Sequence, residues 1–250
     1  LLLAIIYFFD NAGSLSWLYA WGFVTVVSFC ISVIAPIWIM PIFNKFIPLQ
    51  SGELRQAIIE YADSVKFTYG NIYVIDGSKR SAHSNAFFTG FGKTKRIALF
   101  DTLIEQLTPK EIVAVIAHEV GHNKKHHILA GMVLGILHTG ILFFLFSLVM
   151  ESQLLFEAFF MEDVSVYASI VFFGLLFTPL ELIMSPLLQS LSRRNEFQAD
   201  RWAVDTTFEK QHLISGLKKL AANNLSNLSP HPLFVMLNYS HPPLLKRINA

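Results

Sequence analysis

Long apolar stretches that alternate with polar segments are the dominant pattern in this chain. Three stretches contain no Asp, Glu, Lys or Arg: residues 11–44, 128–150 and 164–180, the last of which continues past Glu181 to about residue 191. A helix needs about 20 apolar residues to cross the hydrocarbon core of a bilayer. We therefore predict three membrane-spanning helices rather than buried helices of a large soluble protein, and residues 1–9 are a candidate for the end of a fourth.

The polar region from residue 45 to 127 has the pattern of a small mixed domain. Residues 52–65 place apolar side chains at helical spacing, which predicts a helix. Short apolar runs bounded by turn residues predict strands, and they occupy residues 71–75, 85–90 and 96–100, with a turn at 76–78 and a hairpin connection at Gly92-Lys93-Thr94. The predicted fold class is mainly α: a polytopic α-helical membrane protein with a small β-hairpin or sheet in a polar domain.

Composition supports the membrane assignment and argues against one class of partner. Hydrophobic residues make up 53% of the 250 residues and charged residues only 15%, whereas soluble chains usually carry about 25% charged residues. The formal net charge is +1, so charge gives no reason to expect nucleic acid as a partner. A lipid bilayer is the expected surrounding. The chain opens on three leucines without a Met, and we expect the native protein to extend further at its N-terminus.

The placement of basic residues predicts the topology. All 19 Lys and Arg lie in residues 45–125, 193–219 and 246–247, and threading three spans in order puts these segments on one side of the membrane. The other side receives Asp10 and the acidic segment 151–163. Because positive charge marks the cytoplasmic side, both polar regions are expected in the cytoplasm, at the endoplasmic reticulum membrane of a eukaryote or the inner membrane of a bacterium.

A metal-binding helix follows the predicted hairpin. Thr108-Pro109-Lys110-Glu111 has the form of a capping box, with Thr as the N-cap and Pro at the first helical position. Downstream, His118 and His122 are four residues apart and share one helical face, so both imidazoles can bind one Zn²⁺. Glu119 lies beside them, where it could take a proton from water and pass it to a leaving amine. The pattern predicts a gluzincin-like zinc helix of a metalloprotease, in which Gly121 would let another backbone approach.

Two histidines do not complete a catalytic zinc site, which usually has three protein ligands and one water. The position at which some zinc helices continue to a third histidine is Ile128. We predict Glu196 as the third ligand, because it directly follows the third span and returns to the side that carries the two histidines. Asp200, one turn later, is predicted to hydrogen-bond a ligand histidine. The expected cofactor is one Zn²⁺ per chain.

The predicted chain thus has four regions. They are transmembrane helices in residues 1–44, a cytoplasmic catalytic region with the zinc helix in 45–127, two transmembrane helices in 128–191, and a cytoplasmic catalytic region with the third zinc ligand in 192–250. The two catalytic regions lie on one side of the membrane and can share one site.

Four further histidines and one acidic residue inside a span also have positions that suggest a role. His126 and His127 are assigned to a basic cap at the end of the zinc helix. His138 lies inside a span, at a packed or a cavity position, and Glu181 is expected to face a bundle interior or a water-filled cavity. His241 is held by the two prolines that follow it, which makes it the candidate donor of a hydrogen bond to a substrate oxyanion.

A peptide that reaches a zinc site must be held extended, and adding it as a strand to a sheet edge is the commonest way to do so. Asn85 begins the first strand of the predicted hairpin and is predicted to anchor the peptide backbone. Phe87 and Phe88 are expected to pack in the fold or to line the apolar side of the groove.

Four segments together resemble the Ste24 branch of the M48 metallopeptidases, the integral-membrane CAAX prenyl proteases. The segments are residues 76–90, 118–122, 195–200 and 239–243, the last followed by Arg247. The resemblance implies seven spans around a large intramembrane chamber, and zinc held by two histidines and one glutamate. It implies prenylated peptides ending in a CAAX motif as substrates, cut after the modified cysteine.

The resemblance also assigns roles to single residues. His118, His122 and Glu196 would bind zinc, and Glu119 would be the base. Asn85 would contact the substrate backbone, while His241 and Arg247 would lie near the substrate carbonyl and the site. The chain is shorter than a full member of the family and lacks the early spans, so the chamber formed by this part alone would be incomplete.

Three functions are compatible with these observations. The first is a CAAX-type protease, and the second is a membrane quality-control protease of broader specificity with the same zinc site. The third is a non-catalytic membrane protein or transporter whose metal site is structural. Glu119 argues against the third, because a structural zinc site has no use for a base beside a ligand.

Overall fold

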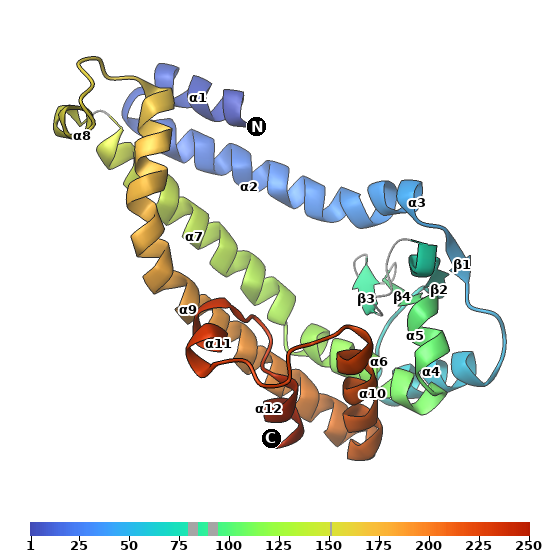
Figure 1. Ribbon diagram of the computed structural model, residues 1–250. Coiled ribbons are helices and arrows are strands. Elements are labelled where there is room, and N and C mark those ends of the chain that lie inside the picture. The colour runs from blue at the N-terminus through green and yellow to red at the C-terminus, as the bar shows by residue number, and fades with distance from the viewer. Residues whose placement is uncertain (80–84, 90–94, 151) are drawn as a thin grey trace. The chain divides into compact units, whose positions relative to one another are not determined.

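The computed structural model describes residues 1–79, 85–89, 95–150 and 152–250 (Figure 1). The chain forms two compact units. We call the first the membrane unit, Leu1–Ser32 with Ile128–Pro186, and the second the polar unit, Val33–His127 with Leu187–Ala250. Each unit therefore brings together segments that are far apart in the sequence.

Helices form all three predicted apolar stretches. The first stretch is α2 (Ser16–Ile34), which continues through a π-helical segment (Ala35–Ile39) into α3 (Met40–Phe43); the other two are α7 (His127–Val149) and α9 (Val166–Thr207). Each of the segments Gly13–Phe43, His127–Val149 and Val166–Thr207 is long and apolar enough to cross a membrane. The prediction that these three stretches form helices long and apolar enough for spans is thereby confirmed. Shorter helices accompany them: α1 (Leu2–Asn11), the 3-10 turn Gly13–Leu15 and α8 (Gln153–Ala158).

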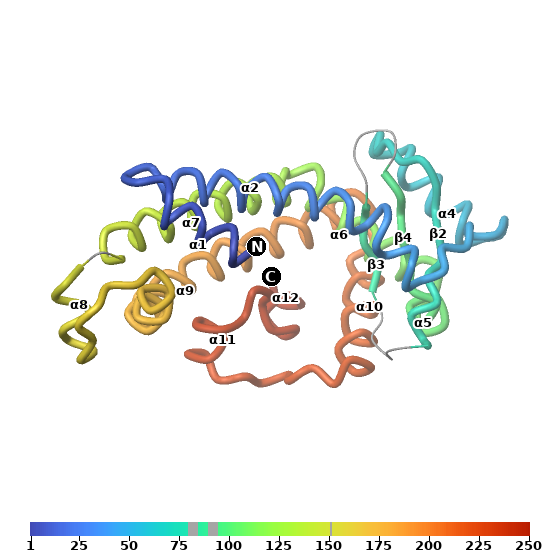
Figure 2. The backbone as a smooth tube through the Cα atoms, turned by 90° about the horizontal axis from the view of Figure 1, so that it is seen from above, coloured from blue at the N-terminus to red at the C-terminus, as the bar shows by residue number. Residues whose placement is uncertain are grey.

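α9 is longer than the sequence pattern predicts. The apolar stretch ends near residue 191, but the helix runs on to Thr207 through two internal prolines, Pro179 and Pro186 (Figure 2). The polar sequence after residue 191 still has helical spacing, so no residue breaks the helix there. The third span and the segment that carries Glu196 are consequently one continuous element.

Aromatic packing and two polar contacts hold the membrane unit together. The Phe9 ring meets the Phe146 ring edge-on at 4.7 Å, and the indole Nε1 of Trp21 donates to the Ile136 carbonyl at 2.9 Å. His138 on α7 lies 3.2 Å from the carboxylate of Glu181 on α9. Polar side chains inside apolar spans usually pair in this way, so His138 and Glu181 satisfy each other.

A four-stranded mixed sheet forms one layer of the polar unit. Its order is β1-β2-β4-β3, with β1 antiparallel to β2, β2 parallel to β4, and β3 antiparallel to β4. The strands are β1 (Phe46–Pro48), β2 (Asn71–Ile75), β3 (Ala86–Thr89) and β4 (Arg96–Phe100). The predicted hairpin is confirmed as the β3/β4 pair, although its connection, Gly92-Lys93-Thr94, lies outside the described residues. β1 and the parallel pairing of β2 with β4 were not predicted.

Besides α3, the adjoining π-helical segment and the part of α9 after Pro186, six helices and one 3-10 turn belong to the described part of the polar unit. They are α4 (Glu53–Ser64), the turn Gly77–Lys79, α5 (Asp101–Gln106), α6 (Pro109–Lys124), α10 (Lys210–Asn223), α11 (Pro232–Asn238) and α12 (Leu244–Ile248). The sequence predicted α4 to within one residue at each end.

One face of α6 anchors that helix in the core of the polar unit. Ile112, Ile116 and Val120 recur every four residues and are at most 1% exposed, in a cluster that includes residues of the sheet, α4 and α10. His118 and His122 lie two residues further along, which is roughly 200° around the helix. The buried stripe therefore fixes the direction in which both histidines point.

The N-terminus of α6 carries the predicted capping box. The Thr108 side chain accepts from the Glu111 backbone N–H, and the Glu111 carboxylate accepts from the Thr108 N–H. Glu111 is 3% exposed and also accepts from Ser215 Oγ at 2.6 Å and Lys219 Nζ at 2.7 Å, both on α10. Burial raises the pKa of Glu111, but the hydrogen bonds from Lys219, Ser215 and Thr108 outweigh burial and lower it to about 2.

Replacing Glu111 is expected to destabilise the polar unit. Glu111→Ala removes the cap and leaves Ser215 and Lys219 without this acceptor, a loss of about 2 kcal/mol. A carboxylate whose pKa is lowered by folding stabilises the fold above its ordinary pKa and loses that effect as pH falls. In thermal unfolding experiments in detergent, the unfolding temperature of Glu111→Ala should thus lie below that of wild type by its full amount above about pH 5. The difference should shrink as the pH falls toward 2. Glu105→Ala, at an exposed position on α5, is the control and should change little.

Candidate metal centre

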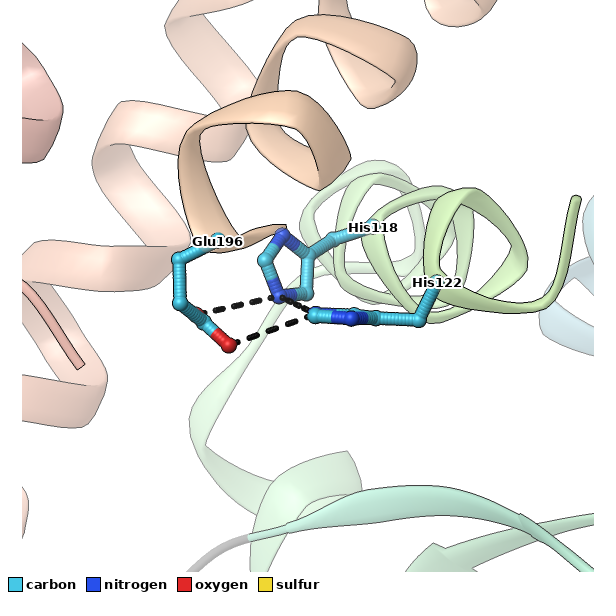
Figure 3. A group of neighbouring side chains, drawn as sticks. All are labelled: His118, His122 and Glu196. Atoms are coloured by element: carbon cyan, nitrogen blue, oxygen red, sulfur yellow. Dashed lines mark hydrogen bonds and ion pairs between the residues drawn. The ribbon is translucent and has the colours of Figure 1, made fainter. Parts of the chain in front are cut away.

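Two helices bring the three predicted metal ligands together. His118 and His122 project from α6 and Glu196 from α9, and their ligand atoms all lie within 4.8 Å of one another (Figure 3). The two Nε2 atoms are 3.1 Å apart. Glu196 Oε2 lies 3.5 Å from His118 Nε2, and Glu196 Oε1 lies 3.3 Å from His122 Nε2. The side chains converge on one point from two elements that are far apart in sequence.

The three side chains fit a metal ion. Two imidazole Nε2 atoms at 3.1 Å would set two lone pairs against each other unless a cation or a proton lies between them. Glu196 is 3% exposed, and among the described residues its Oε2 makes ion-pair contacts with His241 and Arg247 but no hydrogen bond of acceptable geometry. A buried carboxylate oxygen that lacks a hydrogen bond is costly, and a cation would stabilise it. Two nitrogens and one carboxylate form a donor set that suits zinc with an open coordination position.

The hydrogen bond to the outer nitrogen of His118 fits metal binding. His118 Nδ1 lies 2.8 Å from Asp200 Oδ1, and Asp200 is held by Arg247 through Nε at 2.8 Å and Nη2 at 2.6 Å. Burial raises the pKa of Asp200, but the bonds from Arg247 and His118 outweigh it and keep the pKa below its usual range. As a carboxylate, Asp200 accepts a hydrogen bond from the Nδ1–H of His118. The proton stays on Nδ1, so the His118 Nε2 lone pair is free to bind a metal. Asp200 thus contacts the predicted partner.

Glu119 is next to the ligands in sequence and partly buried. Burial raises its pKa, while the nearby His118 and His122 act in the opposite direction. A carboxyl group whose pKa is moved toward neutrality is better suited to accept and then release a proton at physiological pH. The environment of Glu119 is therefore compatible with the predicted role of general base.

The C-terminal segment brings His241 and Arg247 to the same site. His241 Nδ1 lies 3.0 Å from Glu196 Oε2 while its side chain is 66% exposed, and the neighbouring Glu196 carboxylate raises the His241 pKa. Arg247, whose side chain is 13% exposed, contacts Asp200, with Nη1 3.6 Å from Glu196 Oε2 and Nη2 3.4 Å from His118 Nδ1. Arg247 therefore holds Asp200 and lies against the candidate metal ligands. The resemblance placed Arg247 near the site, but its contact with Asp200 was not predicted.

Asn85 lies where a substrate strand could pair. β3 is at the end of the strand order, so it is an edge of the described sheet, and Asn85 directly precedes it. The side chain is exposed, and its Oδ1 accepts from the Ala86 N–H at 2.9 Å. Phe88 packs on Phe67 at 4.9 Å between ring centroids. The predicted edge is confirmed, while the predicted contact of Asn85 with a peptide is still a prediction.

The assignment of His127 to a basic cap at the end of the zinc helix was wrong, because its side chain is buried. His127 is 9% exposed, with Nδ1 3.1 Å from His122 Nδ1 and Nε2 3.1 Å from Gln198 Oε1. Burial lowers its pKa. His126, with a positive φ of 58°, turns the chain between α6 and α7, so the five-residue spacing from His122 does not follow a helical face. A bend of this kind leaves no periodic signal, which is why the sequence pattern missed the contact.

Gly121 explains how α9 reaches α6. A Cβ atom at Gly121 would lie 3.0 Å from Trp202 Cβ and 3.1 Å from Ala199 Cα. Ala199 is on the same helix as Glu196, so the backbone of α9 approaches at the level of the metal ligands. The predicted close approach at Gly121 is confirmed.

Gly121→Ala is expected to weaken metal binding although it alters no ligand. The added methyl meets backbone atoms of Ala199, and overpacking of this kind costs about 1–3 kcal/mol. α9 would have to shift, and Glu196 would move with it. Zinc affinity measured against a competing chelator should fall about tenfold, in line with that strain. Gly135→Ala on α7, where a Cβ meets nothing within 4 Å, is the control. An unchanged affinity in Gly121→Ala would show that the helices tolerate the methyl.

Comparisons with known proteins agree with this geometry. The family model described as peptidase family M48 matches residues 48–250, and the model described as CAAX prenyl protease N-terminal, five membrane helices, matches residues 1–45. The CAAX prenyl protease 1 homolog of Oryza sativa is 42% identical over 99% of this chain and 58% of its own length. CAAX prenyl protease 1 of Saccharomyces cerevisiae is 40% identical over 93% of this chain and 54% of its own length.

A solved structure is also similar to this chain. The crystal structure of S. mikatae Ste24p matches with a TM-score of 0.90 and 38% sequence identity, covering 99% of this chain and 61% of that one. The chain thus spans less than two thirds of the length of the relatives that it matches.

Proposed function

This chain belongs to peptidase family M48, and on that premise we propose that it is the zinc-binding part of a membrane endopeptidase that cleaves prenylated CAAX-type peptides. The observation that carries the proposal is the convergence of His118, His122 and Glu196 within 4.8 Å, beside a glutamate suited to act as a base. The names of the relatives support CAAX-type peptides as the substrate class. Three helices that are long and apolar enough to span a membrane, together with the match to a family model of five membrane helices, support a multi-pass membrane protein.

Zinc is the metal that the donor set favours. When bound, it would supply Lewis-acid chemistry, polarising a carbonyl and making water a better nucleophile. His118, His122 and Glu196 would hold it, and Asp200 would keep the His118 Nε2 lone pair directed inward. Glu119 would take a proton from the attacking water and deliver it to the leaving amine. His241 would donate a hydrogen bond to the oxyanion that develops on the scissile carbonyl.

Two peptides of identical CAAX sequence, one farnesylated at its cysteine and one not, test this function. We expect the zinc-loaded, full-length protein to cleave the farnesylated peptide after the modified cysteine. Chelation should abolish cleavage and added zinc should restore it. Equal cleavage of both peptides would contradict prenyl specificity and favour the broader quality-control protease. Zinc binding without cleavage of either peptide would favour a structural metal site.

We also propose that the polar unit faces the cytoplasm. The basic residues of the chain gather in this unit and its flanks, whereas residues 151–163 carry only acidic charge. In a Cys30→Ser background, Glu157→Cys at an exposed position of α8 should react with an impermeant maleimide only from the non-cytoplasmic face of sealed vesicles. Lys218→Cys, exposed on α10, should react only from the cytoplasmic face. The reverse pattern would invert the topology.

A further inference from the structure

His127 and Gln198 form a chain of contacts behind the second metal histidine. His127 begins α7, and Gln198 lies on α9 between the residues Glu196 and Asp200. His127 Nδ1 is 3.1 Å from His122 Nδ1, and His127 Nε2 is 3.1 Å from Gln198 Oε1. The His122 and His127 rings meet at 76° with centroids 5.0 Å apart.

The positions of the protons along this series of side-chain contacts follow from the donors and acceptors that His122, His127 and Gln198 offer. A neutral imidazole has one N–H and one bare nitrogen. If His122 Nε2 gives its lone pair to a metal, His122 Nδ1 must carry the proton and needs an acceptor. That acceptor is the bare Nδ1 of His127, whose own proton then resides on Nε2. The Nε2–H of His127 donates to Gln198 Oε1. In each of the two contacts, a donor thus faces an acceptor.

The opposite arrangement would block the metal site. A Gln198 amide turned by 180° would present N–H groups to His127 Nε2, which would then have to be bare. The His127 proton would move to Nδ1 and donate to His122 Nδ1, which would leave the His122 proton on Nε2. A protonated Nε2 cannot bind a metal ion. The orientation of a single amide, two contacts away, therefore decides whether His122 can be a ligand.

Resting on the proposed zinc site, we propose that His127 and Gln198 are positioning residues that fix the ring orientation and the tautomer of His122. The arrangement parallels that of His118, whose Nδ1 contacts Asp200, itself held by Arg247. The two supports differ in charge, because one is a carboxylate with an arginine and the other is a neutral histidine with an amide. Each metal histidine is consequently held from behind by a separate pair of side chains.

Two variants of nearly equal shape separate positioning from packing. The Oδ1 atom of an asparagine occupies the place of a histidine Nδ1, because both are bonded to Cγ. His127→Asn therefore keeps an acceptor for His122, whereas His127→Leu has the same branching and offers none. Loss of a hydrogen-bonding partner behind a metal ligand typically costs about 10–100-fold in metal affinity. We expect that loss in His127→Leu and in Gln198→Leu, and near wild-type affinity in His127→Asn.

Zinc affinity of the full-length apo-protein, measured by competition with a chromophoric chelator, decides the matter without a peptidase assay. His212→Leu is the control, since His212 pairs with Glu209 and contacts none of the three metal ligands. Circular dichroism checks that each variant is folded. Equal zinc affinity in His127→Leu and His127→Asn would overturn the inference while leaving the proposed function intact. Wild-type protein that binds no zinc would overturn both.

Discussion

Glu119→Gln is expected to keep the metal and to lose nearly all peptidase activity. The amide has almost the same shape as the carboxylate but cannot accept a proton, so the substitution removes only the transfer of a proton from water to the leaving amine. Loss of a general base typically costs about 10²–10⁴ in rate. Burial raises the pKa of Glu119, and the neutral amide has no desolvation penalty to meet, so the fold should be at least as stable as in wild type.

The measurement compares kcat on a farnesylated peptide with zinc content on the same preparation. A matched Glu105→Gln variant, at an exposed position on α5, should retain both. A low rate accompanied by lost zinc would show that Glu119 supports the metal site rather than the proton transfer. A rate near that of wild type would mean that another group is the base.

The sequence could predict the convergence of the three candidate metal ligands because helical spacing and charge placement both carry that information. The capping box starts α6 at a defined residue, and four-residue spacing puts His118 and His122 on one face. Glu196 could be predicted because charge placement brings the segment after the third span back to the side of the zinc helix. The structure then places all three within 4.8 Å, although α9 forms one unbroken helix where the hydropathy pattern shows a boundary.

Contacts made across turns could not be predicted in the same way. His127 reaches His122 only because the chain bends at His126, and no periodic pattern records a bend. Arg247 meets Asp200 through the C-terminal segment, whose path depends on tertiary packing. The parallel pairing of β2 with β4 likewise depends on the chain between the two strands. Each of these contacts joins residues whose separation in sequence follows no helical or strand period.

His241 and Asn85 are expected to affect catalysis in different ways. A peptide paired with the β3 edge makes backbone contacts in both the ground state and the transition state, so Asn85→Ala should mainly raise KM. The Asn85 Oδ1 already accepts from Ala86, and its amide N–H groups are the atoms that can donate to a peptide carbonyl. The oxyanion develops only in the transition state, so His241→Ala should mainly lower kcat. Loss of one such donor typically costs about 10²–10³ in turnover.

The contact of His241 with Glu196 suggests a second possible role for His241, which the same variant can test. His241 Nδ1 lies 3.0 Å from Glu196 Oε2 and its side chain is 66% exposed, so the ring could hold the third metal ligand instead of meeting the substrate. In that case His241→Ala would lower zinc affinity, and kcat at saturating zinc would not change. Steady-state kinetics at saturating zinc, combined with chelator competition on the same variant, separates the two roles. We expect kcat to fall even when the site is fully loaded, because the 66% exposure of the His241 side chain leaves the ring accessible to a substrate.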